Sequence, residues 1–159
     1  MGLRIGNGYD AHRFAPGRTL VLGGVEIPFE KGLLGHSDAD VLVHAVIDAL
    51  LGAARLGDIG GAFPDGDPAY KDISSLELLR RAGNIIEQGG FRAVNIDSVV
   101  VAQRPRLAPY VPEMERNIAR ALNIPPEDCS VKATTEEGMG FTGTGEGMAA
   151  WACCLLEKL

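Results

Sequence analysis

Three residues near the N-terminus have the types and spacing of metal ligands. Asp10 and His12 are two residues apart, so an extended segment would point both side chains to the same side. His44 lies in a stretch that is predicted to be helical. Two imidazoles and one carboxylate leave a fourth coordination position open, which is the pattern of catalytic zinc sites. Spacing alone leaves a second interpretation open, because Asp-x-His turns are common and a lone histidine on an apolar helix face is usually a packed core residue.

Groups suited to binding phosphate are spread over several loops. His36 and Ser37 precede a predicted helix, whose free backbone N–H groups would favour an anion. Thr134 and Thr135 supply hydroxyl donors, and the segments 57–68 and 137–147 are rich in glycine and acidic residues. Such loops are often binding loops. Together with a metal site, they indicate a diphosphate ligand, although the sequence has no P-loop motif.

The elements that must position these groups follow from hydrophobic periodicity and capping signals. We expect a strand over 3–9, a hairpin over 19–28 that turns at Gly23-Gly24, and a helix from a cap at Ser37 or Asp38 to about residue 55. A capping box at Ser74 predicts a second helix to residue 89. A strand over 93–103, a helix over 109–123 and strands over 130–135 and 147–156 complete the order. This order predicts an α+β domain with a mixed sheet and helices on one face.

Composition limits the classes of function. With 159 residues, we expect a single catalytic domain over 1–159. A net charge of −6 argues against a nucleic-acid partner. No apolar run approaches the ~20 residues of a membrane span. Three cysteines, two of them adjacent, are expected to be reduced thiols of a cytoplasmic protein. The strand over 147–156 is apolar on both faces, so we expect an oligomer to cover the second face.

Six ordered motifs together resemble the 2-C-methyl-D-erythritol 2,4-cyclodiphosphate synthase family, over about residues 4–156. One motif is Asp10-x-His12, and the others are LGHSDADV at 34–41, LGDIG at 56–60, FPD at 63–65, VKATTE at 131–136 and GFTGTGEG at 140–147. The resemblance implies a ferredoxin-like α+β subunit that assembles as a homotrimer with active sites between neighbours. It implies that the substrate is the cytidine-diphosphate compound 4-diphosphocytidyl-2-C-methyl-D-erythritol 2-phosphate, used in non-mevalonate isoprenoid biosynthesis. The 2-phosphate would attack the β-phosphorus, and CMP would leave as the cyclic diphosphate forms.

The resemblance also implies a role for each matching residue. Asp10, His12 and His44 would bind Zn²⁺, and Glu137 would bind a second ion, Mg²⁺ or Mn²⁺. His36 and Thr135 would act in catalysis by hydrogen bonding to phosphate in the transition state. The residues expected to bind the methylerythritol part of the substrate are Asp58, Gly60, Phe63, Pro64, Asp65, Gly66 and Asp67. Four further residues are expected to bind the substrate, namely Ser37, Ile59, Glu136 and Phe141. The residues expected to form the cytidine pocket of the adjacent subunit are Ala102, Gln103, Arg104, Pro105, Arg106, Leu107, Ala108, Ala133 and Thr134.

Two other functions remain as alternatives. A zinc-dependent phosphoesterase would share the metal site but use water as the nucleophile, so its product would be free phosphate. A non-catalytic trimer that binds isoprenoid diphosphate would not require Asp58, Thr135 and Glu137 together. Asp48, one helical turn after His44, is expected either to orient that imidazole or to be an ordinary polar helix residue.

Overall fold

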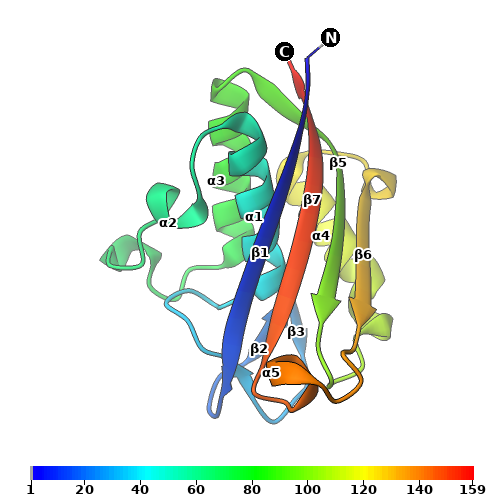
Figure 1. The fold of residues 1–159 in the computed structure, drawn as a ribbon. Coiled ribbons are helices and arrows are strands. Elements are labelled where there is room, and N and C mark those ends of the chain that lie inside the picture. The colour runs from blue at the N-terminus through cyan, green and yellow to red at the C-terminus, as the bar shows by residue number, and fades with distance from the viewer. Residues whose placement is uncertain (1) are drawn as a thin grey trace.

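The computed structural model describes residues 2–159 of the chain (Figure 1). The strands are β1 (Leu3–Ala15), β2 (Leu20–Leu22), β3 (Val25–Ile27), β4 (Gly32–Leu33), β5 (Phe91–Val101), β6 (Cys129–Thr134) and β7 (Gly147–Lys158). The α-helices are α1 (Val41–Ala54), α2 (Ile59–Ala62), α3 (Ser75–Gln88), α4 (Val111–Leu122) and α5 (Gly140–Gly143). Short 3-10 turns occur at Pro68–Tyr70, Ala108–Tyr110 and Pro126–Asp128.

The main sheet has five strands in the order β4-β1-β7-β5-β6. Its pairs are antiparallel except for β5 with β6, which are parallel. Strands β2 and β3 form a separate hairpin, and Figure 1 shows α1, α3 and α4 together on one side of the main sheet. The predicted α+β fold with a mixed sheet and helices on one face is therefore confirmed.

Strand β1 has two different faces. Its residues alternate between inward and outward positions, with Gly6 and Gly8 buried while Ile5 and Tyr9 are exposed. A Cβ atom built on Gly6 would lie 2.0 Å from the carbonyl oxygen of Ala49, and one built on Gly8 would lie 2.0 Å from that of Ala45. Because no side chain fits there, these glycines allow α1 to pack directly against β1.

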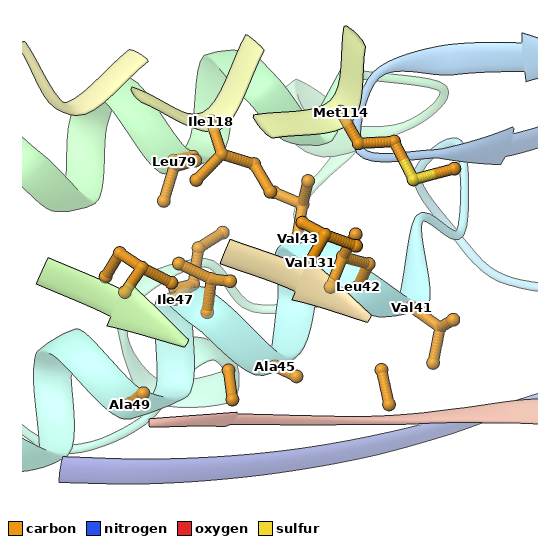
Figure 2. Packing of buried hydrophobic residues seen from close by; sticks show 14 of the residues in the cluster. Val41, Leu42, Val43, Ala45, Ile47, Ala49, Leu79, Met114, Ile118 and Val131 are labelled. Atoms are coloured by element: carbon orange, nitrogen blue, oxygen red, sulfur yellow. The ribbon is translucent and has the colours of Figure 1, made fainter. Parts of the chain in front are cut away.

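Helix α1 is the centre of the core. Twelve of its residues are buried, which is the pattern of a helix that is covered on nearly all sides. Figure 2 shows Ala45 and Ala49 on the side of α1 near the sheet, with Leu79 of α3 and Ile118 of α4 beyond the helix. The small alanines allow close approach to the sheet, and the larger side chains fill the space between the helices.

The first helix begins later than the sequence predicted. Its N-cap is Asp40, whose carboxylate accepts from the backbone N–H groups of Gly23, Gly24 and Val43 at 3.0, 2.8 and 3.1 Å. The caps proposed at Ser37 or Asp38 are therefore wrong. The side chain of Asp40 caps the helix and also bonds the β2–β3 hairpin. Local sequence does not reveal this second contact.

Other differences concern boundaries and short elements. Strand β1 continues past the predicted end at Tyr9 to Ala15 because it pairs with β7 along nearly its whole length. The capping box at Ser74 is not formed, since that side chain makes no capping hydrogen bond and Glu77 pairs with Arg80 and Arg81 instead. Helices α2 and α5 lie in segments that were expected to be irregular.

Among residues 2–159, no helix is both long and apolar enough to span a membrane.

Candidate active site

Asp10, His12 and His44 meet where β1 lies against α1. One ligand atom from each residue lies within 4.8 Å of the other two. The Oδ2 atom of Asp10 is 2.8 Å from Nε2 of His12 and 3.1 Å from Nδ1 of His44, and these two nitrogens are 3.2 Å apart. The donor set fits the observed preference of zinc for imidazole nitrogen and carboxylate oxygen. Among the described residues, this is the one such group of metal-ligand type.

In each imidazole, the ring nitrogen that faces away from Asp10 also makes hydrogen bonds. The Nδ1–H group of His12 donates to the carbonyl oxygen of Leu34 at 2.8 Å, which leaves Nε2 free to bind a metal. The Nε2 atom of His44 lies 2.9 Å from Oγ of Ser75 and 3.2 Å from Oγ of Ser37. The two rings therefore present different nitrogens to the same point, each held from behind by a hydrogen bond.

Electrostatics keep Asp10 ionised. Burial alone would raise the pKa of this carboxyl group, but hydrogen bonds from His12 and His44, and the charges of both rings, together lower it to about 2. Burial alone would lower the pKa of His12, but the hydrogen bond and charge of Asp10 raise it instead. Asp10 is consequently a carboxylate at neutral pH, which is the form that a metal ligand requires.

A cavity of about 160 Å³ opens beside these three residues. Six further residues that were predicted to bind substrate or act in catalysis line it, namely His36, Ser37, Ile59, Gly60, Phe63 and Asp65. Gly35, Tyr70 and Leu78 also line the cavity and were not predicted. Tyr70 follows the polar loop, and Leu78 fits the apolar face of α3, so neither carries a signal of function in the sequence.

The remaining predicted residues of the 57–68 loop do not line this cavity. The Asp58 carboxylate accepts from the N–H group of Gly61 at 2.8 Å and caps α2. The Asp67 carboxylate caps the turn at Pro68–Tyr70, and its carbonyl oxygen accepts from Nε2–H of His36 at 3.2 Å. Pro64 and Gly66 likewise lie outside the lining.

Asp48 does not orient His44. Its carboxylate accepts from the backbone N–H group of Ile59 at 2.8 Å, so it holds the start of α2 against α1. Burial, followed by the charges of Asp58 and Asp10, raises the pKa of Asp48. The hydroxyl groups of Ser37 and Ser75, rather than this carboxylate, contact the imidazole of His44.

A second cavity, of about 600 Å³, lies between the loop after β5 and the end of β6. Its lining contains all nine residues that were expected to form a cytidine pocket, together with Thr135 and the unpredicted Phe29. It has no lining residue in common with the cavity beside the metal ligands. The structure therefore gathers many of the predicted residues into two separate groups on one chain.

Three predicted site residues in the segment after β6 have different surroundings, namely Glu136, Glu137 and Phe141. The Glu136 carboxylate accepts from the hydroxyl group of Thr142, so it stabilises the loop. Glu137 is exposed and has a left-handed backbone, with φ of 53°, and its N–H group donates to Oγ1 of Thr135 at 3.2 Å. Phe141 lines a further cavity of about 270 Å³ beside His12.

Comparison with known sequences gives a match over nearly the whole chain. The model of the YgbB family matches residues 3–157. A relative from Pelotomaculum thermopropionicum, named 2-C-methyl-D-erythritol 2,4-cyclodiphosphate synthase, is 62% identical over 156 residues, which cover 98% of this chain and 96% of the relative.

Comparison with solved structures shows the same fold. The bifunctional IspDF of Campylobacter jejuni matches with a TM-score of 0.95 and 44% identity over 99% of this chain, which spans 43% of that longer protein. A CDP complex of IspF from Plasmodium falciparum matches with a TM-score of 0.86 and 35% identity, over 99% of this chain and 97% of that one.

Proposed function

Because the chain belongs to the YgbB family, whose relatives are named 2-C-methyl-D-erythritol 2,4-cyclodiphosphate synthases, and is therefore a lyase, we propose that it cyclises 4-diphosphocytidyl-2-C-methyl-D-erythritol 2-phosphate. An oxygen of the 2-phosphate attacks the β-phosphorus. The bond from that phosphorus to the bridging oxygen breaks, and CMP leaves with the oxygen. The observation that carries the proposal is the convergence of Asp10, His12 and His44 beside a cavity lined by the predicted substrate residues.

The reaction needs positioning more than an activated protein nucleophile, since the nucleophile and the leaving group belong to one molecule. Phe63 and Ile59 give the cavity apolar walls on which the methylerythritol carbons can pack. His36 and Ser37 line the same cavity, where their side chains would donate to phosphate oxygens once substrate is bound. These residues hold the substrate folded, so that the 2-phosphate faces the β-phosphorus in line with the departing oxygen.

Metal ions belong to the proposal. Asp10, His12 and His44 would hold Zn²⁺, and Glu137 would hold Mg²⁺ or Mn²⁺ once the substrate diphosphate completes its coordination. Bound cations would offset the repulsion between the phosphates and the charge that develops on the departing CMP. Glu137 is exposed and belongs to no group of three metal-ligand residues among residues 2–159, which suits an ion that relies on phosphate oxygens for most of its coordination.

We also propose that each active site is shared between two subunits of a homotrimer. The metal ligands and the predicted cytidine pocket lie in separate cavities of one chain, so one substrate would join the first cavity of one subunit to the second cavity of its neighbour. The outer face of the sheet carries Ile5, Tyr9 and Trp151, which are 79%, 44% and 51% exposed. An apolar sheet face of this kind is typical of an interface between subunits.

A cytoplasmic location completes the proposal. Cys129, Cys153 and Cys154 are free thiols, which is usual in a reducing compartment.

Product analysis tests the reaction directly. The protein is incubated with the cytidine-diphosphate substrate, zinc and Mg²⁺, and the products are identified by mass spectrometry. We expect equal amounts of CMP and the cyclic diphosphate. Free phosphate without cyclic product would indicate a phosphoesterase, and tight binding without turnover would indicate a non-catalytic binder.

Light scattering tests the assembly. We expect about three times the chain mass of 16.8 kDa. A stable monomer with full activity would contradict both the trimer and the shared site.

A further inference from the structure

The second nitrogen of His44 is bonded inside the protein. Its Nε2 atom lies 2.9 Å from Oγ of Ser75, the first residue of α3. Ser75 is fully buried, so water does not compete for this contact. His44 belongs to α1 and Ser75 to α3, and the hydrogen bond therefore joins the ligand-bearing helix to its neighbour.

Asp38 sets the direction of this hydrogen bond. The hydroxyl group of Ser75 donates to Oδ1 of Asp38, and the backbone N–H group of Ser75 donates to Oδ2 at 3.0 Å. A serine hydroxyl has one hydrogen, and the carboxylate takes it. Oγ of Ser75 must then accept from Nε2–H of His44, so in the neutral imidazole, the form that binds a metal, the proton lies on Nε2 and the lone pair lies on Nδ1. Nδ1 is the atom that faces Asp10 and His12.

Ser37 is the weaker partner of the same nitrogen. Its Oγ atom is 3.2 Å from Nε2 of His44 and already accepts from the N–H group of Ala39 at 3.1 Å. Among residues 2–159, no carboxylate accepts the hydrogen of this hydroxyl group. Ser75 therefore provides the shorter and better-oriented acceptor for His44.

We propose that Ser75 and Asp38 are positioning residues of the metal site, which act through His44 by fixing its tautomer and ring orientation so that Nδ1 faces the ion. The proposal rests on zinc binding by Asp10, His12 and His44 in the proposed function. Asp38 would then do more than bind the first backbone N–H group of α3, and Ser75 would do more than fill space in the core. Acceptors of this kind behind a metal-bound histidine typically raise metal affinity by about 10- to 100-fold.

The test measures the zinc dissociation constant by competition with a chromophoric chelator. The proteins are wild type, Ser75→Ala, Asp38→Asn and the double variant. Ser74→Ala is the matched control, because Ser74 is the exposed neighbour and its side chain makes no capping hydrogen bond. Circular dichroism of each variant reports folding independently of metal.

We expect Ser75→Ala to raise the zinc dissociation constant about 10- to 100-fold, while Ser74→Ala leaves it unchanged. Asp38→Asn should weaken zinc binding in the wild-type background and have no further effect when Ser75 is already alanine. A purely structural role of Asp38 at the start of α3 would instead give the same effect in both backgrounds, because the backbone N–H group of residue 75 remains.

The outcomes separate this proposal from the proposed function. Equal zinc affinity of Ser75→Ala and Ser74→Ala would overturn the role of Ser75, even if the wild type binds zinc and turns over substrate. If Asp38→Asn does not fold, the comparison of these two serine variants decides the matter alone. A wild-type protein that binds no zinc would overturn the metal assignment itself, and this proposal with it.

Discussion

The two groups of candidate site residues differ in how the fold holds them. Asp10, His12 and His44 lie on β1 and α1, which pack without space for a side chain at Gly8. The second group lies mostly on the loop after β5 and at the end of β6, where Thr135 and the neighbouring Glu137 are exposed. The first site is assembled within one chain, whereas the second offers separate groups around a wide cavity.

The difference indicates a division of tasks. A metal that is bound before substrate needs ligands fixed to a few tenths of an ångström, and packed regular elements provide this precision. Groups that act only on bound substrate can lie on loops and be completed by the substrate itself and by a neighbouring subunit. We therefore expect substitutions in the second group to impair turnover and those in the first to impair metal binding.

The largest effect should come from Glu137→Gln. Without this carboxylate the second metal ion would not be held, so the charge on the departing phosphate would lack a compensating cation; turnover should fall by about 10²- to 10³-fold, while bound zinc and the trimer remain. Steady-state kinetics with Mg²⁺, together with metal analysis, measure both properties. Glu113→Gln, at an exposed glutamate in the first turn of α4, should behave as wild type. Near wild-type cyclisation by Glu137→Gln would show that this carboxylate is only a solvated loop residue.

Gly8→Ala should disturb the first group without changing a ligand. Its new methyl group would meet the carbonyl oxygen of Ala45, the residue next to His44, and overpacking of this kind costs about 1–3 kcal/mol of unfolding free energy. Displacement of α1 should also weaken zinc binding. Urea denaturation and zinc titration measure the two effects.

Gly52→Ala, a glycine-to-alanine change on α1 itself, is the matched control. A Cβ atom at Gly52 meets nothing within 4 Å, and alanine in a helix interior is more stable than glycine by about 0.8–1 kcal/mol. This variant should be more stable than wild type and retain its zinc affinity. If Gly8→Ala has the stability and the zinc affinity of wild type, the close contact of α1 with β1 does not position the site.

A further prediction concerns pH and Asp40. Burial, followed by the charge of Asp38, raises the pKa of Asp40 to about 6, despite three backbone N–H donors. The folded state thus holds this proton more tightly than the unfolded state, so the contribution of Asp40 is fully present below about pH 4 and is lost as pH rises to about 6. The slope should reach at most about 1.4 kcal/mol per pH unit.

Chemical denaturation of wild type and Asp40→Asn over this pH range measures that contribution. The unfolding free energy of wild type minus that of Asp40→Asn should fall as pH rises from about 4 and become constant above about pH 6. A difference that is independent of pH would contradict the raised pKa.

The sequence predicted the first group better than the second. The two-residue spacing of Asp10 and His12 needs only a strand to place both side chains on one side, and pairing with β7 provides that strand. The end of β1 was misplaced because its polar residues after Tyr9 break the apolar pattern. The residues proposed to bind cytidine followed from resemblance alone, since no periodicity marks loop residues as neighbours.

Contacts between distant segments could not be predicted. Ser75 and Asp38 are 37 residues apart, and no sequence pattern around either residue predicts a hydrogen bond to His44. Asp40 lies beside the residues proposed as caps, but its bonds to the hairpin at Gly23 and Gly24 depend on tertiary packing. The helices α2 and α5 have four residues each and were hidden by glycine-rich sequence.

The central claim is that β1 and α1 form a zinc site without help from the loop groups. Metal analysis of purified wild type, His44→Ala and His36→Ala tests it most directly, because His36 lines the same cavity but is not one of the three ligands. We predict about one zinc per chain in wild type and in His36→Ala, and loss of most zinc from a folded His44→Ala. Unchanged zinc in His44→Ala would contradict the claim.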